Sequence, residues 1–235
     1  MSSNSAYLAL LIDAPLQSWG CSSRFQRRTT GLHPTKSGVV GMVCAAMGLA
    51  KGSAAERETL PKLASLRMSC LTLPKRMGGR WQGSPEELRM GRLEDYNTVL
   101  GTRRADGAIS NNAVETRRQY LLDARFGVIL GGDRAILDRV AGAMQDPVWG
   151  VWFGRKCCIP ADVVVRGVFG SVEEARRILI GDEPAGCFTC VDEVDRFEDG
   201  TDTLNDQPVS FGDATSSGLD ARRFAPRRIE VRPGS

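Results

Sequence analysis

Histidine is nearly absent from this chain of 235 residues, because His33 is the only one. Histidine is the side chain that most often transfers protons near neutral pH, and it is the commonest metal ligand. One histidine excludes a His-rich metal site. The Cys187 to Cys190 pair is a lone Cys-x-x-Cys with no second pair or histidine pair nearby, which argues against zinc. We therefore predict no metal and no cofactor.

Long apolar runs are also missing. No apolar segment approaches the roughly 20 residues that a membrane-spanning helix needs. The first apolar run covers only 7–12 and has no basic segment before it, unlike a signal peptide. The seven cysteines are odd in number and irregularly spaced, which favours reduced thiols over disulfides. We expect a cytoplasmic protein that makes no membrane contact.

Acidic residues are missing from one long stretch. Between Asp13 and Glu56 there is no Asp or Glu, although the net charge of the chain is only +3. This asymmetry is typical of a surface that binds a polyanion. The opposite charge gathers in 182–206, which holds nine carboxylates, and we place that segment away from any nucleic acid. The basic residues of the acid-free stretch are Arg24, Arg27, Arg28, Lys36 and Lys51.

Within the acid-free stretch, a basic loop leads directly into a helix that we expect at 38–49. Thr35 or Ser37 can cap its first turn, and Gly38 keeps the backbone there accessible. An anion could then bind the N–H groups of the first turn. The simpler alternative is an ordinary capped helix behind a solvated loop. The charge for an anion site would come from Arg24, Arg27, Arg28 and Lys36.

The hydrophobic pattern predicts a single α+β domain. Two strand–helix–strand units are typical of a ferredoxin-like or RRM-like sheet. We expect residues 1–160 to form this fold and 161–235 to be a C-terminal extension of the same domain. The strands are expected at 7–12, 67–73, 119–130 (bent near Asp123) and 148–153, and the helices at 38–49 and 134–144, the second capped by Asp133.

The segment 74–118 interrupts this pattern. Glycines alternate with basic and polar residues, and only 93–100 could form a strand. So long a structureless loop is unusual inside a compact domain, so we expect a projecting hairpin. Its basic residues are candidates for nucleic-acid contact, with a solvated surface as the alternative. They are Arg103, Arg104 and Arg117.

A second basic turn follows the last predicted strand. Gly154 would allow close approach of a nucleic-acid backbone, and Arg155 and Lys156 would supply charge. The alternative is a simple turn. Aromatic side chains can also stack on bases, although Trp19 has a core contact as its alternative, and Trp149 and Trp152 are expected to pack inside. The stacking candidates are Trp19, Trp81 and Tyr96.

Five motifs, in order, resemble those of a known family, the CasD subunits of the type I-E CRISPR surveillance complex, Cascade. Segments 206–211 and 222–229 resemble motifs of the same family more weakly. The five motifs are APLQSWG at 14–20, the 28–41 segment that ends in PTKSGVVG, DYNTV at 95–99, YLLDARF at 120–126 and PVWGVWFGRKCCIP at 147–160.

The resemblance implies a RAMP protein with a modified RRM or ferredoxin-like fold and a projecting thumb. It implies binding of the 5′ handle of the CRISPR RNA and contacts with the backbone and large subunits, with target DNA met only through the complex. By analogy, 74–118 corresponds to the thumb. The RNA-binding candidates are Arg24, Arg27, Arg28, Lys36, Ser37, Gly38, Arg103, Arg104, Arg117, Gly154, Arg155 and Lys156.

The alternative function is a metal-independent endoribonuclease, because RAMP proteins include enzymes that process precursor CRISPR RNA. Such cleavage activates a 2′-hydroxyl and usually needs a general base and a general acid. His33 has no carboxylate near it in sequence, and the remaining arrangement is Tyr96 or Tyr120 with Lys36. We expect no catalytic residue and a non-catalytic RNA-binding subunit.

Overall fold

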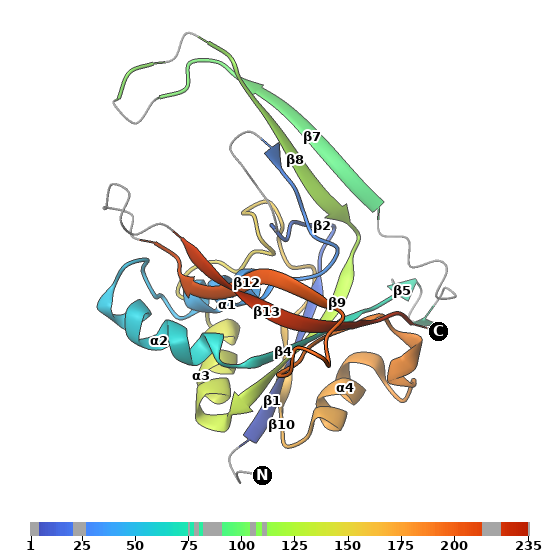
Figure 1. Cartoon of the computed structure of the whole chain (residues 1–235). Coiled ribbons are helices and arrows are strands. Elements are labelled where there is room, and N and C mark those ends of the chain that lie inside the picture. The colour runs from blue at the N-terminus through green and yellow to red at the C-terminus, as the bar shows by residue number, and fades with distance from the viewer. Residues whose placement is uncertain are drawn as a thin grey trace.

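The computed structural model describes residues 5–20, 27–74, 76–77, 80–81, 91–103, 107–109, 112–212 and 222–234. Two predicted site residues, Arg24 and Arg104, lie outside these ranges. A large antiparallel sheet carries helices on both faces, and a long hairpin projects away from it (Figure 1). The predicted α+β class and the projecting hairpin are confirmed.

The main sheet contains the predicted ferredoxin-like core. Every neighbouring pair of its strands is antiparallel. In chain order the core strands are β1, β4, β9 and β10, and in space they run 4-1-3-2, as two interleaved βαβ units require. The complete spatial order is β10 (Val165–Phe169), β1 (Ser5–Asp13), β9 (Arg125–Asp133), β4 (Arg67–Thr72), β11 (Cys190–Glu193), β13 (Arg223–Arg232) and β12 (Asp202–Ser210).

The fourth core strand is not the predicted one. Residues 148–153 form an irregular segment with bends, and β10 takes the place beside β1, beyond residue 160. The N–H groups of Val148 and Trp149 donate to the carbonyls of Ala46 and Ala45 at 2.9 and 3.2 Å, so this apolar run is tied to the end of a helix. An apolar run alone does not distinguish a strand from a segment that covers a helix end.

The structure contains the two predicted helices and two that the sequence analysis missed, α2 and α4. Thr35 caps α1, because its Oγ1 accepts from the N–H of Gly38 at 3.2 Å. Asp133 caps α3 as predicted, accepting from the N–H of Ile136 at 3.1 Å. The helices are α1 (Lys36–Ala46), α2 (Ala54–Ala64), α3 (Arg134–Gln145) and α4 (Val172–Ile180), together with a short 3₁₀ turn, η2 (Ala185–Cys187). No helix of the described residues is both long and apolar enough to span a membrane.

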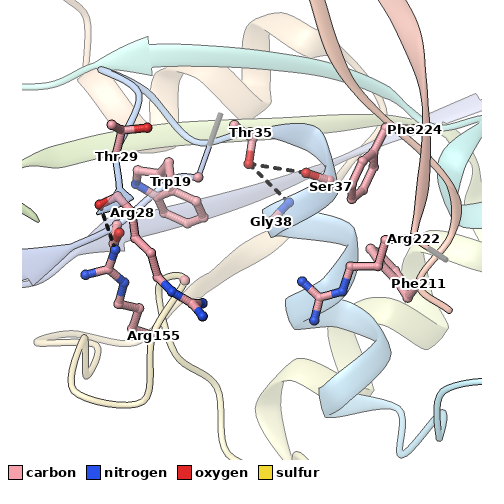
Figure 2. A pocket seen from close by; sticks show the side chains of 13 residues that line it. Trp19, Arg28, Thr29, Thr35, Ser37, Gly38, Arg155, Phe211, Arg222 and Phe224 are labelled. Atoms are coloured by element: carbon pink, nitrogen blue, oxygen red, sulfur yellow. Dashed lines mark hydrogen bonds between the residues drawn. The ribbon is translucent and has the colours of Figure 1, made fainter. Parts of the chain in front are cut away.

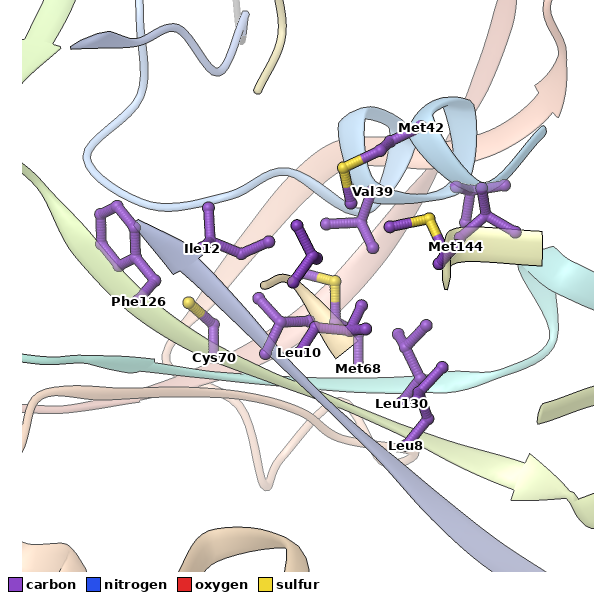
Figure 3. Packing of buried hydrophobic residues seen from close by; sticks show 14 of the residues in the cluster. Leu8, Leu10, Ile12, Val39, Met42, Met68, Cys70, Phe126, Leu130 and Met144 are labelled. Atoms are coloured by element: carbon purple, nitrogen blue, oxygen red, sulfur yellow. The ribbon is translucent and has the colours of Figure 1, made fainter. Parts of the chain in front are cut away.

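Strand β1 is buried on both faces, so its alternating side chains form two apolar clusters. One face packs under α1, α2 and α3, and the other packs on α4. Burying each large apolar side chain contributes about 1.5–3 kcal/mol. The first cluster includes Leu8, Leu10 and Ile12 of β1, Val39 and Met42 of α1, and Met144 of α3 (Figure 3).

The projecting hairpin has β7 on one side and β8 on the other, paired along their full length. The predicted long strand at 119–130 is divided between β8 and β9 at Asp123, whose φ is 50°. Two short segments flank β8, with β3 pairing to it in parallel. The remaining strands are β2 (Leu16–Gln17), β3 (Arg27–Arg28), β5 (Arg76–Met77), β6 (Arg80–Trp81), β7 (Gly91–Val99) and β8 (Val114–Leu122).

A group of buried charges joins the C-terminal strands to the start of α1. Asp206 of β12 accepts from the backbone N–H of Lys36 at 2.7 Å and forms a bidentate pair with Arg227 of β13 at 2.9 and 2.8 Å. The Lys36 ammonium lies 2.9 Å from the carboxylate of Glu193 on β11. These contacts hold the β12–β13 ribbon against α1.

His33 lies beside this charge group, immediately before α1. Burial lowers its pKa from 6.5, and the Arg227 charge acts in the same direction, while a hydrogen bond to Pro34 and the Asp206 charge oppose the shift. The folded protein therefore binds this proton less tightly than the unfolded chain does. Its contribution to stability is complete above the ordinary pKa and falls as the pH drops below it.

Replacing Asp206 with Ala is expected to destabilise the protein by about 3–5 kcal/mol, because the buried Arg227 guanidinium is left without its partner. The measurement is the free energy of unfolding in urea at neutral pH. Glu58→Ala is the matched control, since it breaks an exposed pair with Lys62 and should change stability by about 0.5 kcal/mol or less. Equal destabilisation in both variants would contradict a structural role for the buried charges.

The His33→Gln variant is expected to show a weaker pH dependence of stability. As the pH falls from about 7.5 to about 5, the wild-type free energy of unfolding should decline more steeply than that of the variant, because the unfolded imidazole takes up its proton first. Carboxylates titrate alike in both proteins, so the difference between the two curves isolates His33. Parallel curves would show that the pKa of His33 is unshifted.

Candidate nucleic-acid interface

A cavity of about 580 Å³ opens beside the first turn of α1. In Figure 2 the segment around Trp19 and Arg28 lies on one side and the ends of β12 and β13 lie on the other, with the start of α1 between them. Five of the predicted site residues lie together here, namely Arg28, Ser37, Gly38, Gly154 and Arg155. The other lining residues are Ser18, Trp19, Gly20, Thr29, Thr35, Phe211, Arg222 and Phe224.

Two glycines allow three segments to close around the cavity. A Cβ on Gly38 would lie 2.9 Å from the indole of Trp19. Gly154 has a φ of +94°, which favours glycine, and a Cβ there would lie 1.7 Å from the carbonyl oxygen of Ser18. Both glycines are therefore required by the packing of the cavity wall itself.

Trp19 belongs to the core more than to the surface. Its side chain is 1% exposed, packs on the ring of Phe153 with centroids 6.1 Å apart, and donates from Nε1 to Gln17 at 3.0 Å. The core alternative for this residue is thus confirmed, although one edge of the indole lines the cavity.

Arginines from three segments lie close to one another beside the cavity, and two of them, Arg28 and Arg155, line it. In the parallel pairing of β3 with β8, Arg27 lies beside Arg117 and Arg28 beside Arg118. Arg155 donates from Nη2 to the carbonyl oxygen of Arg28 at 3.2 Å. Glu94 forms an ion pair with Arg117 at 3.5 Å, whereas Arg28 and Arg118 are like charges in register, and their repulsion favours a bound anion.

Two atoms of this arginine group are buried without a hydrogen-bond partner. They are Nε of Arg118 and Nη1 of Arg155. The guanidinium of Arg155 also lies 4.5 Å from the ring centroid of Tyr120, which fixes its plane. Buried donors are nearly always satisfied in native proteins, so these two require water or a ligand. Arg118 belongs to a basic pair in the sequence but was not among the predicted site residues.

The far wall of the cavity comes from residues that the sequence analysis did not select. Phe211 follows β12, Arg222 precedes β13, and Phe224 lies within β13 (Figure 2). Within the described part of the chain, no carboxylate forms an ion pair with Arg222. The sequence did contain a signal for these residues. Segments 206–211 and 222–229 weakly resemble motifs of the family, and Arg222–Arg223 is a basic pair.

The structure corrects the prediction for Lys36. Its side chain is 1% exposed and paired with Glu193, so the ammonium faces the protein interior and cannot reach RNA. Burial lowers the pKa of Lys36, and the hydrogen bond and charge of Glu193 oppose that shift. The anion at the start of α1 is Asp206 of the protein itself. The acidic segment 182–206 was expected to lie away from the predicted binding loop, but its residue Asp206 lies at the end of that loop.

Other predicted residues lie away from the cavity. Arg103 is exposed near the end of the hairpin, where it forms an isolated bridge with Ile109. Tyr96 and Arg117 lie on the hairpin strands, with the Arg117 guanidinium 5.4 Å from the Tyr96 ring centroid. The side chain of Trp81 lies outside the described residues.

The catalytic arrangement considered for a ribonuclease does not come together. The Tyr120 hydroxyl is buried against the Cys157 thiol at 3.7 Å, Tyr96 lies on the hairpin, and Lys36 is paired with Glu193. In the parts of the chain that the structure describes, no three His, Cys, Asp or Glu side chains form a group that could hold a metal ion. Burial raises the pKa of the Cys158 thiol to about 12, so it stays protonated.

Comparison with known proteins identifies the family. A family model described as CRISPR-associated protein (Cas_Cas5) matches residues 7–230. The chain is 27% identical to the Cascade subunit CasD of the CRISPR system of Escherichia coli (strain K12) over 187 residues, which cover 77% of this chain and 79% of that protein.

Two solved structures are similar over 97% of this chain. A chain of a CRISPR RNA-guided surveillance complex superposes with a TM-score of 0.72 at 27% identity and is covered over 90% of its length. A crystal structure of a Cas protein superposes with a TM-score of 0.56 at 29% identity and is covered over 95%. Because the family model matches nearly the whole chain, the protein belongs to the CRISPR-associated Cas5 family.

Proposed function

We propose that this chain is a non-catalytic RNA-binding subunit of a CRISPR Cascade surveillance complex, and that the cavity at α1 holds the 5′ handle of the CRISPR RNA. The observation that carries the proposal is the convergence of Arg28, Arg155 and Arg222 on one cavity, where Nη1 of Arg155 is buried without a hydrogen-bond partner. The similarity to CasD of Cascade supports the choice of ligand.

The chemistry of the cavity suits single-stranded RNA. Such RNA is recognised by its phosphates, its 2′-hydroxyls and its splayed bases. Arginine forks bind phosphate, and the hydroxyl of Ser37 can exchange hydrogen bonds with ribose. Phe211 and Phe224 offer rings on which bases stack. The cavity volume of about 580 Å³ lies in the range of ligand sites.

The hairpin supports contact with other subunits. It carries exposed apolar side chains on both faces of β7, a strand that pairs on one side only, and beyond the end of that strand. Apolar groups exposed in this way are typical of protein-binding surfaces. We assign to the hairpin the contact with the backbone subunit of the complex, and we place the large subunit beside the bound 5′ handle. Target DNA is contacted only through the complex. The exposed residues are Leu93, Tyr96, Val99, Leu100 and Ile109.

Removing a cavity arginine is expected to weaken both RNA binding and its salt dependence. For Arg28→Ala, and separately for Arg222→Ala, the slope of log affinity against log salt concentration should fall by about 0.7 for each phosphate that the variant no longer binds. The measurement is fluorescence anisotropy of handle RNA over a salt series. Arg139→Ala removes an equal charge from the exposed side of α3 and is the control. Unchanged slopes in both cavity variants, with intact folding, would refute phosphate binding here.

The purified chain is expected to leave repeat RNA uncut, with or without Mg²⁺. A positioned general base contributes about 10²- to 10⁴-fold to such a rate, and His33 has its Nδ1 3.2 Å from the Pro34 carbonyl oxygen, away from the cavity lining. The assay is gel analysis of labelled RNA, with His33→Gln alongside. Site-specific cleavage that disappears in the variant would establish the ribonuclease in place of the binding subunit.

A further inference from the structure

A second cavity, of about 400 Å³, lies along the outer side of α1. It shares six lining residues with the first cavity, so the two are continuous around the start of the helix. The new part of the wall is more apolar and contains two indoles, Trp149 and Trp152. The shared residues are Ser37, Gly38, Gly154, Arg155, Phe211 and Arg222.

Trp149 is exposed although its backbone is firmly held. Its N–H donates to the carbonyl of Ala45 at 3.2 Å, and the N–H of Val148 donates to Ala46 at 2.9 Å, which satisfies two carbonyls at the end of α1. The side chain is nevertheless 44% exposed. The expectation that Trp149 packs inside is thus wrong. A large ring on a fixed backbone is a ready platform for a flat ligand.

Trp152 forms the inner part of the same wall. A Cβ on Gly150 would lie 2.5 Å from its ring, so glycine is required for the two to pack together. The Lys156 ammonium lies 5.8 Å from the Trp152 ring centroid. This cation holds the indole in place and adds positive charge beside the cavity.

Positive charge also lines the opposite side of the second cavity. Burial lowers the pKa of Lys51, the neighbouring Arg222 charge lowers it further, and Glu56 opposes both. Glu56 itself is 4% exposed. Its carboxylate accepts from the N–H of Gly52 at 2.7 Å, so it already has a hydrogen-bond partner at the start of α2. Neither Lys51 nor Arg222 forms an ion pair with any carboxylate that the structure describes.

We infer that the second cavity binds a further nucleotide of the same single-stranded RNA, with its base on the Trp149 ring and its phosphate between Lys51 and Arg222. This inference rests on the proposed function and extends the bound RNA around α1. Continuity with the first cavity makes the two sites parts of one path. Stacking on an aromatic ring is tolerant of base identity, so this position is expected to take any base.

RNA fits the cavity better than an acidic peptide does. The cations are spread along the cavity and into its neighbour, as a repeating phosphate backbone requires, and the apolar wall includes three flat rings, Trp149, Trp152 and Phe211. A carboxylate side chain would use one of these cations and leave the others without a partner.

The test is an affinity series for the full chain with oligouridylates that grow by one nucleotide at a time. The wild-type protein should bind more tightly when the RNA becomes long enough to enter the second cavity. Trp149→Ala should bind the long RNAs about tenfold more weakly, equivalent to about 1.4 kcal/mol, and the short ones as well as wild type does. Trp149→Tyr should keep most of the wild-type affinity for long RNA. Phe197→Ala removes an aromatic side chain that is 74% exposed elsewhere, and serves as the control.

Tryptophan fluorescence supplies a second measurement. Long oligouridylates should quench the wild-type signal, and this quenching should be weaker in Trp149→Phe, in which Trp152 and Trp19 still line the two cavities. If RNA binds but its affinity for every length is unchanged in Trp149→Ala, the second site is refuted while the proposed function stands. If no oligonucleotide binds, the proposed function itself fails. Dissociation of a partner protein from the complex in Trp149→Ala, with RNA affinity intact, would assign this cavity to protein docking and also refute the inference.

Discussion

The buried carboxylate of Asp206 is the group on which the candidate site depends. It accepts from the backbone N–H that opens α1 and forms a bidentate pair with Arg227, so one side chain joins a helix to two strands. Strand β12 ends just before Phe211 and β13 begins just after Arg222, and these two residues form part of the far wall of the cavity. Because the partners are nearly fully buried, the pair is costly to break. The buried ion pair therefore fixes the position of the far wall of the cavity.

The same carboxylate changes the role of the helix N-terminus. A helix start is commonly a site for phosphate, but here the protein supplies its own anion at the first N–H, and Thr35 caps the turn. Positive charge for RNA comes from side chains around the helix instead. Arg28 of β3 and Arg118 of β8 lie in register and repel each other in the free chain, so a bound polyanion is expected to stabilise the protein.

Local patterns predicted the local structure well. The strand at 7–12, the helices that begin near residues 36 and 134, the caps Thr35 and Asp133 and the projecting hairpin follow from periodicity and from capping residues. Long-range contacts could not be predicted in this way. Lys36 was predicted to bind RNA because its neighbours in the sequence include no acidic residue. Its actual partners, Glu193 and Asp206, are 157 and 170 residues away in the sequence. The far wall escaped prediction for the same reason. The prediction of a strand at 148–153 is wrong, because an apolar run that covers the end of a helix has the same composition as a strand.

The most direct measurement is photo-crosslinking of RNA to this chain within the complex, purified after co-expression with its genomic neighbours. RNA containing 4-thiouridine is crosslinked, and the attached peptides are identified by mass spectrometry. A discrete RNA with a uniform 5′ end should be recovered, with crosslinks on peptides that contain residues 27–38, 147–156 and 222–224, three of the segments that line the two cavities. Recovery of an RNA-free chain, or crosslinks confined to the α4 face of the sheet, would contradict RNA binding at α1.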